Sequence, residues 1–129
     1  MTGLDTNVLV RYFTRDDPRQ FRAAARLFEE IAQTGGFVNV IVLCELAWVL
    51  ESAYGLGREA IANVFRTLLD TAQLSIEDRD LVARAVDEFR EGKAGLSDYL
   101  VGVKNRAAGC DVTVTFDRAL RASEAFRVL

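Results

Sequence analysis

The stretch that most constrains this chain is residues 4–10, where a short apolar run is interrupted by an acid. Asp5 follows the first apolar residues, and the small polar pair Thr6 and Asn7 precedes renewed apolar sequence. This pattern predicts a short buried strand, an acid at its carboxyl end and a turn into a helix. Ligands bind at the carboxyl ends of strands in parallel α/β sheets, and a carboxylate there needs a cation, a donor or water.

Composition narrows the classes of protein. The chain has 129 residues, 50% apolar and 27% charged, which predicts one globular domain over residues 1–129. It has no histidine, which excludes histidine-based triads, histidine general bases and histidine zinc sites. The net charge of −3 argues against binding nucleic acid through bulk positive charge, although metal ions and a few arginines can still hold phosphate.

The cysteines and the termini predict the compartment. Cys44 and Cys110 stand alone without a CxxC pattern, which argues against structural zinc and predicts free thiols in a reducing cytoplasm. The N-terminus lacks a signal-like segment, and the most apolar window, residues 37–53, contains acids and is too short to span a membrane. A cytoplasmic protein with no membrane contact is expected.

Helical periodicity alternates with short β-branched segments along the whole chain. Strands are predicted at the N-terminus and over residues 37–40, 73–76, 112–115 and 126–129. Helices are predicted over residues 7–13, 19–33, 41–54, 61–69, 82–89 and 96–107. This alternation predicts an α/β fold, a three-layer single domain with a mainly parallel central sheet.

Four acids fall where such a sheet would gather them. Asp5 and Asp117 follow predicted strands, and Glu45 and Asp98 lie in the early turns of predicted helices. Crossover helices begin at the carboxyl edge of a parallel sheet, so all four can converge there. Clustered carboxylates need a cation, and Mg²⁺ or Mn²⁺ fits oxygen ligands and activates water without histidine. The alternative is that Asp98 is only a helix N-terminal acid and Asp117 only a turn residue.

The motifs around these acids resemble those of PIN-domain nucleases, most closely the VapC-type toxins of bacterial toxin–antitoxin pairs. They read Leu-Asp-Thr-Asn-Val-Leu at 4–9, Val-Leu-Cys-Glu-Leu at 42–46, Ser-Asp-Tyr-Leu-Val at 97–101 and Thr-Phe-Asp at 115–117. Each motif alone is weak, but the four come in order and cover essentially the whole chain. The chain departs from the pattern at Gly95, where many relatives carry a further acid, and at Thr2 and Asn39.

The resemblance implies a metal-dependent endoribonuclease that binds Mg²⁺ or Mn²⁺, cuts RNA and is held inactive by a cognate antitoxin. It assigns the metal-binding and catalytic roles to Asp5, Glu45, Asp98 and Asp117, with Thr6, Asn7 and Thr115 as supporting polar residues. Arginines that flank these acids in sequence are candidate RNA contacts: Arg11, Arg15, Arg118 and Arg121. The antitoxin groove is expected to be lined by Tyr12, Phe13, Phe28 and Trp48. A homodimer is also expected, with Phe126, Val128 and Leu129 at its interface.

Three other interpretations compete with this one. A non-catalytic PIN-like module would use the same acidic edge to hold the arginines of a partner. A receiver domain would need paired acids after the first strand and a lysine after a late strand, and the chain has neither. The run Gly55-Leu56-Gly57-Arg58-Glu59-Ala60 matches a dinucleotide-binding pattern, but it follows a predicted helix instead of a strand.

Overall fold

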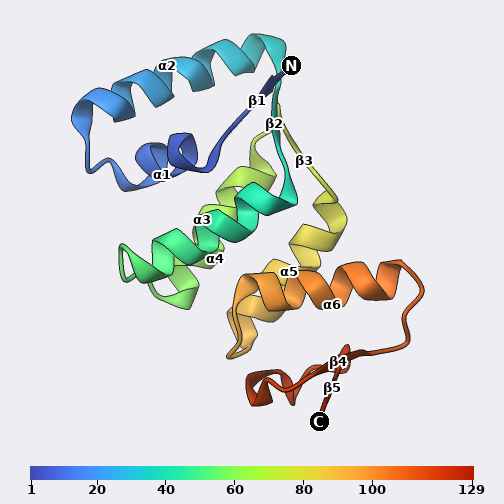
Figure 1. Ribbon diagram of the computed structural model, residues 1–129. Coiled ribbons are helices and arrows are strands. Elements are labelled where there is room, and N and C mark those ends of the chain that lie inside the picture. Colours follow the sequence, from blue (N-terminus) through green and yellow to red (C-terminus); the bar gives the residue numbers. More distant parts are fainter.

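The computed structural model describes residues 1–129 and contains six α-helices, five short strands and one short 3₁₀ helix (Figure 1). The helices are α1 (Thr6–Thr14), α2 (Pro18–Thr34), α3 (Val40–Ser52), α4 (Arg58–Asp70), α5 (Arg79–Glu91) and α6 (Leu96–Ala107). The strands are β1 (Thr2–Gly3), β2 (Gly36–Val38), β3 (Leu74–Ile76), β4 (Thr113–Thr115) and β5 (Phe126–Val128), and η1 (Arg118–Leu120) is the 3₁₀ helix. Every predicted segment is present, with its ends shifted by a few residues, but β1, which was predicted to be buried, consists of two exposed residues.

Capping residues set the helix ends. Asp17 accepts hydrogen bonds from backbone N–H groups in the first turn of α2, and Pro18 occupies the first helical position. The same helix ends at Gly35, whose φ of 84° lies in a region that glycine adopts without steric penalty. Asn39 begins α3 by accepting a hydrogen bond of 2.9 Å from the N–H of Val42. None of the helices combines the length and apolar character needed to cross a membrane.

The main sheet has three parallel strands in the order β1-β2-β3, with Phe37 at its centre opposite both Gly3 and Ser75. Figure 1 shows α1 and α2 at one end of the molecule, α3 and α4 in the middle, and α5 and α6 toward the other end. One cluster of 27 buried residues joins these elements, including Leu46, Phe65 and Leu100. Burial of this apolar surface is the main stabilising contribution to the fold.

The last two strands do not extend the main sheet. Strands β4 and β5 pair in parallel as a separate two-stranded sheet, which with η1 forms what we call the C-terminal unit, residues 113–128. This unit packs on α6, at the opposite end of the molecule from β1 (Figure 1). Phe126 lies directly against Gly102 of α6, where a Cβ atom would come within 2.6 Å of the ring. The parallel α/β fold is thus confirmed, but its strands divide between two sheets.

This division leaves apolar surface exposed. The solvent-accessible area is 7580 Å², against about 6,800 Å² expected for a compact monomer of this mass. Val114 is 46% exposed and Phe116 is 81% exposed, both in or beside β4. On β1, Thr2 and Leu4 donate their N–H groups to the β2 side, so the amide of Gly3 faces the free outer edge.

Candidate active site

Asp5 lies at the junction of β1 and α1. Its Oδ1 atom accepts a hydrogen bond of 2.8 Å from the N–H of Thr6, so the acid caps the helix that follows it. The side chain of Thr6 is buried, with 6% exposure, and its Oγ1 atom has no hydrogen-bond partner. Unpartnered buried polar atoms are costly and are a reason to look for an ion or ligand at this position. Asp5 is exposed, as is the adjacent Asn7.

Glu45 lies on the exposed face of α3. Its carboxylate makes no ion pair and no side-chain hydrogen bond within the chain. Two large apolar side chains share this face one turn away on either side: Ile41, 67% exposed, and Trp48, 70% exposed. The acid is therefore open to solvent between two exposed apolar groups.

Asp98 lies in the first turn of α6. Its Oδ2 atom accepts a hydrogen bond of 3.1 Å from the N–H of Gly95, the N-cap residue, and so helps to cap the helix. This turn adjoins α3, because residues 95–97 and four α3 residues, among them Cys44 and Trp48, line one small hollow. Helix α1, which Asp5 caps, also packs on α3. Three of the four predicted acids thus belong to the adjoining helices α1, α3 and α6.

Asp117 lies on the C-terminal unit, which packs on α6. Its Oδ1 atom accepts a hydrogen bond of 2.9 Å from the N–H of Ala119 and caps η1. Its own N–H donates to Oγ1 of Thr115 over 3.0 Å, so Thr115 orients the turn that carries the acid. No three acidic or cysteine side chains lie close enough together to hold one metal ion.

The donor set nevertheless has the chemistry of a hard-cation site. Its groups are carboxylate and hydroxyl oxygens, which divalent cations such as Mg²⁺ prefer. None of the four acids is ion-paired with a lysine or arginine; the ion pairs of the chain lie elsewhere. The residues fit a metal by type, whereas their placement does not complete a metal centre.

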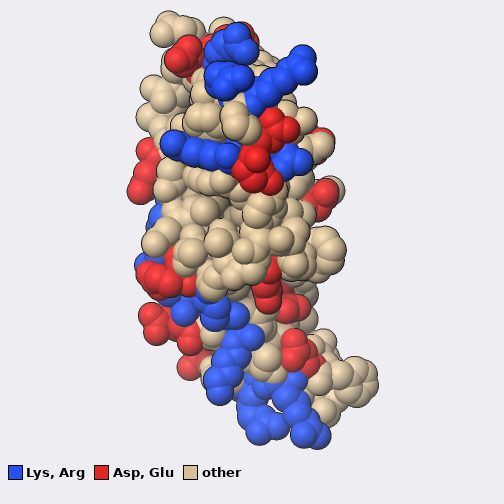
Figure 2. Space-filling view, turned by 90° about the vertical axis from the view of Figure 1, so that its left-hand side faces the viewer, with Lys and Arg blue, Asp and Glu red and all other residues tan.

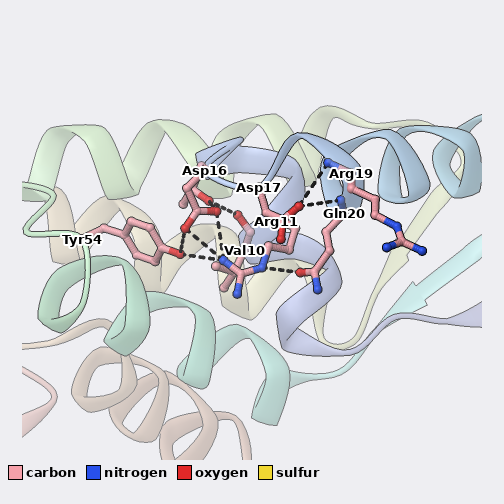
Figure 3. A network of polar contacts seen from close by, with 8 residues as sticks. Val10, Arg11, Asp16, Asp17, Arg19, Gln20 and Tyr54 are labelled. Atoms are coloured by element: carbon pink, nitrogen blue, oxygen red, sulfur yellow. Dashed lines mark hydrogen bonds and ion pairs between the residues drawn. The ribbon is translucent and has the colours of Figure 1, made fainter.

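Arg11, a predicted RNA contact, is engaged within the protein (Figure 3). Its Nε atom donates to Gln20 over 2.6 Å, and its Nη1 atom donates to Asp16 over 2.9 Å and to the Tyr54 hydroxyl over 3.1 Å. The Tyr54 hydroxyl in turn donates to Asp16 over 2.7 Å. This hydrogen bond, joined by those from Thr14 and Arg11, lowers the pKa of Asp16 to about 2. Arg11 therefore ties the start of α2 to the end of α3.

The other three predicted arginines differ from one another. Arg15 has a φ of 55° and ends α1, and its guanidinium lies over the Phe21 ring, 4.5 Å from the centroid. Arg118 and Arg121 are exposed and line a large hollow between α5, α6 and η1. They remain available to a ligand.

Two further cations line the same hollow, and neither was predicted from the sequence: Lys93 and Arg106. None of the four is ion-paired, and Figure 2 shows lysine and arginine gathered at this end of the molecule. Burial raises the pKa of Glu88, another residue of the hollow, against the opposing effects of Arg106 and Arg84. Spacing along the chain gave no signal for this cluster, because it forms only when three separate segments meet.

The predicted antitoxin groove is partly filled by the chain itself. The Tyr12 ring stacks on Phe28 at 4.1 Å and on Phe21 at 5.9 Å, and it lies 5.4 Å from Phe13. These rings are half-buried at the contact between α1 and α2. Trp48, in contrast, is open. Of the residues predicted for a dimer interface, Phe126 packs on α6, Val128 is half-buried and Leu129 is exposed.

Fold and site together define a class of protein: an α/β domain with unpaired acids after parallel strands and in the first turns of the helices. Residues 4–124 match the PIN domain family, and the chain belongs to that family. No curated protein matches the chain. PIN domains are generally nucleases that use divalent metals, so the chain has a nuclease-type fold. The matched range includes all four predicted acids.

Proposed function

We propose that the chain is a metal-dependent endoribonuclease and the toxin of a toxin–antitoxin pair. One observation carries the proposal: the PIN match spans residues 4–124, and within it the four motif acids are free of ion pairs. Carboxylates that no lysine or arginine neutralises are available to a cation. The absence of histidine leaves metal-assisted attack by water as the mechanism that suits these residues.

The proposed roles follow from the elements that carry the acids. Asp5, Glu45 and Asp98 are the proposed primary ligands because α1 and α6 both pack on α3, although the three acids do not lie close enough together in this structure to share one ion. An Mg²⁺ or Mn²⁺ ion held by these residues would supply a water of lowered pKa and would offset the negative charge of the scissile phosphate. Thr6 offers its unpartnered hydroxyl beside Asp5. Thr115 orients Asp117, the proposed fourth acid of the set.

The partners are RNA, a cognate antitoxin and a second copy of the chain. Arg118 and Arg121, with Lys93 and Arg106, are suited to RNA phosphates because no carboxylate pairs with them. A basic antitoxin residue entering among the acids would form charge-assisted hydrogen bonds. The cytoplasm is the proposed site of action, since RNA and antitoxin meet there.

Cleavage of RNA by the purified chain tests the enzymatic part. We expect cleavage with Mg²⁺ or Mn²⁺, none with EDTA, and a loss of orders of magnitude in Asp5→Asn and Asp98→Asn. Glu29→Gln is the matched control, since Glu29 is exposed on α2 and makes no ion pair. Cleavage that persists in EDTA, or in Asp5→Asn, would contradict the proposal.

Growth tests the toxin part. Expression of the chain alone should arrest growth, and co-expression of the adjacent upstream gene should relieve the arrest. Asp5→Asn should be harmless in the same cells at equal protein level. Normal growth with a chain that cuts RNA in vitro would leave a nuclease that is not a toxin.

A non-catalytic binding module is the second candidate, and the separation of the acids from one another favours it. Because no three acids lie within reach of one ion, the acidic edge can serve instead to hold arginines of a partner. This candidate predicts no cleavage with any metal and a partner whose binding is lost in Asp5→Asn and Glu45→Gln.

A further inference from the structure

The only tryptophan of the chain is among its most exposed large apolar side chains. Trp48 is 70% exposed, although tryptophan is highly buried on average. It lies one turn after Glu45 on the same face of α3. Its exposure therefore places a flat aromatic surface beside a residue of the proposed active site.

Trp48 also forms one wall of the hollow between α3 and the first turn of α6. Its lining includes the apolar residues Ala47, Leu96 and Phe89 and the polar residues Glu51 and Ser97, and its volume is about 50 Å³. No lysine or arginine lines it. The hollow thus lies between the turns that carry Glu45 and Asp98.

The chemistry of this hollow selects one part of a nucleotide. A phosphate would meet no cation and would be repelled by Glu51. The hollow, at about 50 Å³, is too small to enclose a nucleobase, but the face of a base can stack on the exposed indole while its edge meets groups at the hollow that accept and donate hydrogen bonds. The carboxylate of Glu51 can accept from an exocyclic amino group, as carboxylates do from cytosine.

We infer that Trp48 binds the substrate by stacking on an unpaired base next to the scissile phosphate. The inference rests on the proposed endoribonuclease function and adds to it a residue that binds an unpaired base of the RNA. Base pairing would hide the faces and edges that the hollow recognises. The acids act on the phosphate, and Trp48 holds the neighbouring base, so the two sets of residues have separable effects.

Fluorescence tests the inference, because a single tryptophan reports on this position alone. The full chain carrying Asp5→Asn, with Mg²⁺ present, is titrated with unstructured ten-nucleotide oligoadenylate and oligouridylate. We expect saturable quenching by at least one of them. Tripolyphosphate, which has charge but no base, should produce none, and an RNA duplex should produce less.

Substitutions separate stacking from general apolar contact. In a chain with Asp5 intact, Trp48→Ala should raise the KM for single-stranded RNA by about 10-fold at unchanged kcat, and Trp48→Phe should stay within about 3-fold of the parent. Ile41→Ala is the matched control, since Ile41 is similarly exposed on the same helix face but has no ring. Its KM should not change.

The outcomes distinguish this inference from the function on which it rests. If the chain cuts RNA but shows no quenching, and Trp48→Ala has an unchanged KM, the inference is overturned and the proposed endoribonuclease function still holds. Quenching without cleavage under any metal overturns the nuclease and leaves base binding. Equal losses in Ile41→Ala and Trp48→Ala indicate a general apolar contact, such as a protein partner makes, and also overturn the inference.

Discussion

Substitution of Gly102 by alanine tests how the C-terminal unit is held. Gly102 lies within α6, and an added Cβ would be 2.6 Å from Cε2 and 3.0 Å from Cζ of Phe126. Alanine in place of glycine inside a helix normally stabilises by about 1 kcal/mol. Overpacking costs about 1–3 kcal/mol. We therefore expect Gly102→Ala to lower the free energy of unfolding, by up to about 2 kcal/mol.

The sign should reverse when the ring is removed. In a Phe126→Ala background the overlap is gone, so Gly102→Ala should stabilise by about 1 kcal/mol through helix propensity. Urea denaturation of the four chains, with slopes compared to exclude a change in the unfolded state, measures both values. Stabilisation by Gly102→Ala in both backgrounds would refute the packing of β5 on α6.

Four more predictions follow from the described contacts. Because the folded pKa of Asp16 is about 2, below its ordinary 3.8, the stability that Asp16 contributes is present above about pH 4 and is lost as the pH falls through 2. Tyr54→Phe should raise that pKa in an NMR titration, and an unchanged value would exclude the Tyr54 hydrogen bond as its main cause. Mn²⁺ should raise the Tm of the parent but raise that of Asp5→Asn much less, by mass action; equal shifts in calorimetry would place the ion elsewhere. If Asp117 joins the other acids, saturating Mn²⁺ should draw the C-terminal unit toward β1 and reduce the radius of gyration in small-angle scattering, and an unchanged profile would exclude that movement. Burial raises the pKa of the Cys44 thiol, so a thiol reagent at pH 8 should modify the exposed Cys110 first, and mass mapping would detect the opposite order.

The helices could be predicted from the sequence because their signals are local. Asp17 and Pro18 mark the start of α2, and Gly35 marks its end, through backbone preferences that need no distant partner. Which face of α3 is exposed was harder to predict from the sequence. Tryptophan is usually buried, but α3 meets its neighbours with other faces and leaves the face with Trp48 to solvent.

The contacts of the arginines could not be predicted from neighbouring residues in the sequence. Arg11 lies close in sequence to Asp5, which made it a candidate phosphate contact. Its guanidinium is instead hydrogen-bonded to Tyr54, 43 residues away, and to Asp16 and Gln20, which the turn after α1 brings near it. Lys93 and Arg106 gave no pattern along the chain, yet they line one hollow with Arg118 and Arg121.

By itself the sequence determined the parallel α/β class, the alternating elements and an acid at the end of β1 and in the early turns of α3 and α6. These features depend on hydrophobic periodicity, capping and turn chemistry within a few residues. Only the tertiary structure decided which strands pair. Strand β4 carries the same β-branched pattern whether it joins β1 or β5, and the choice is made by contacts such as Phe126 on Gly102, 24 residues apart. The position of Asp117 follows from that choice, because pairing between strands is a long-range contact that no local pattern encodes.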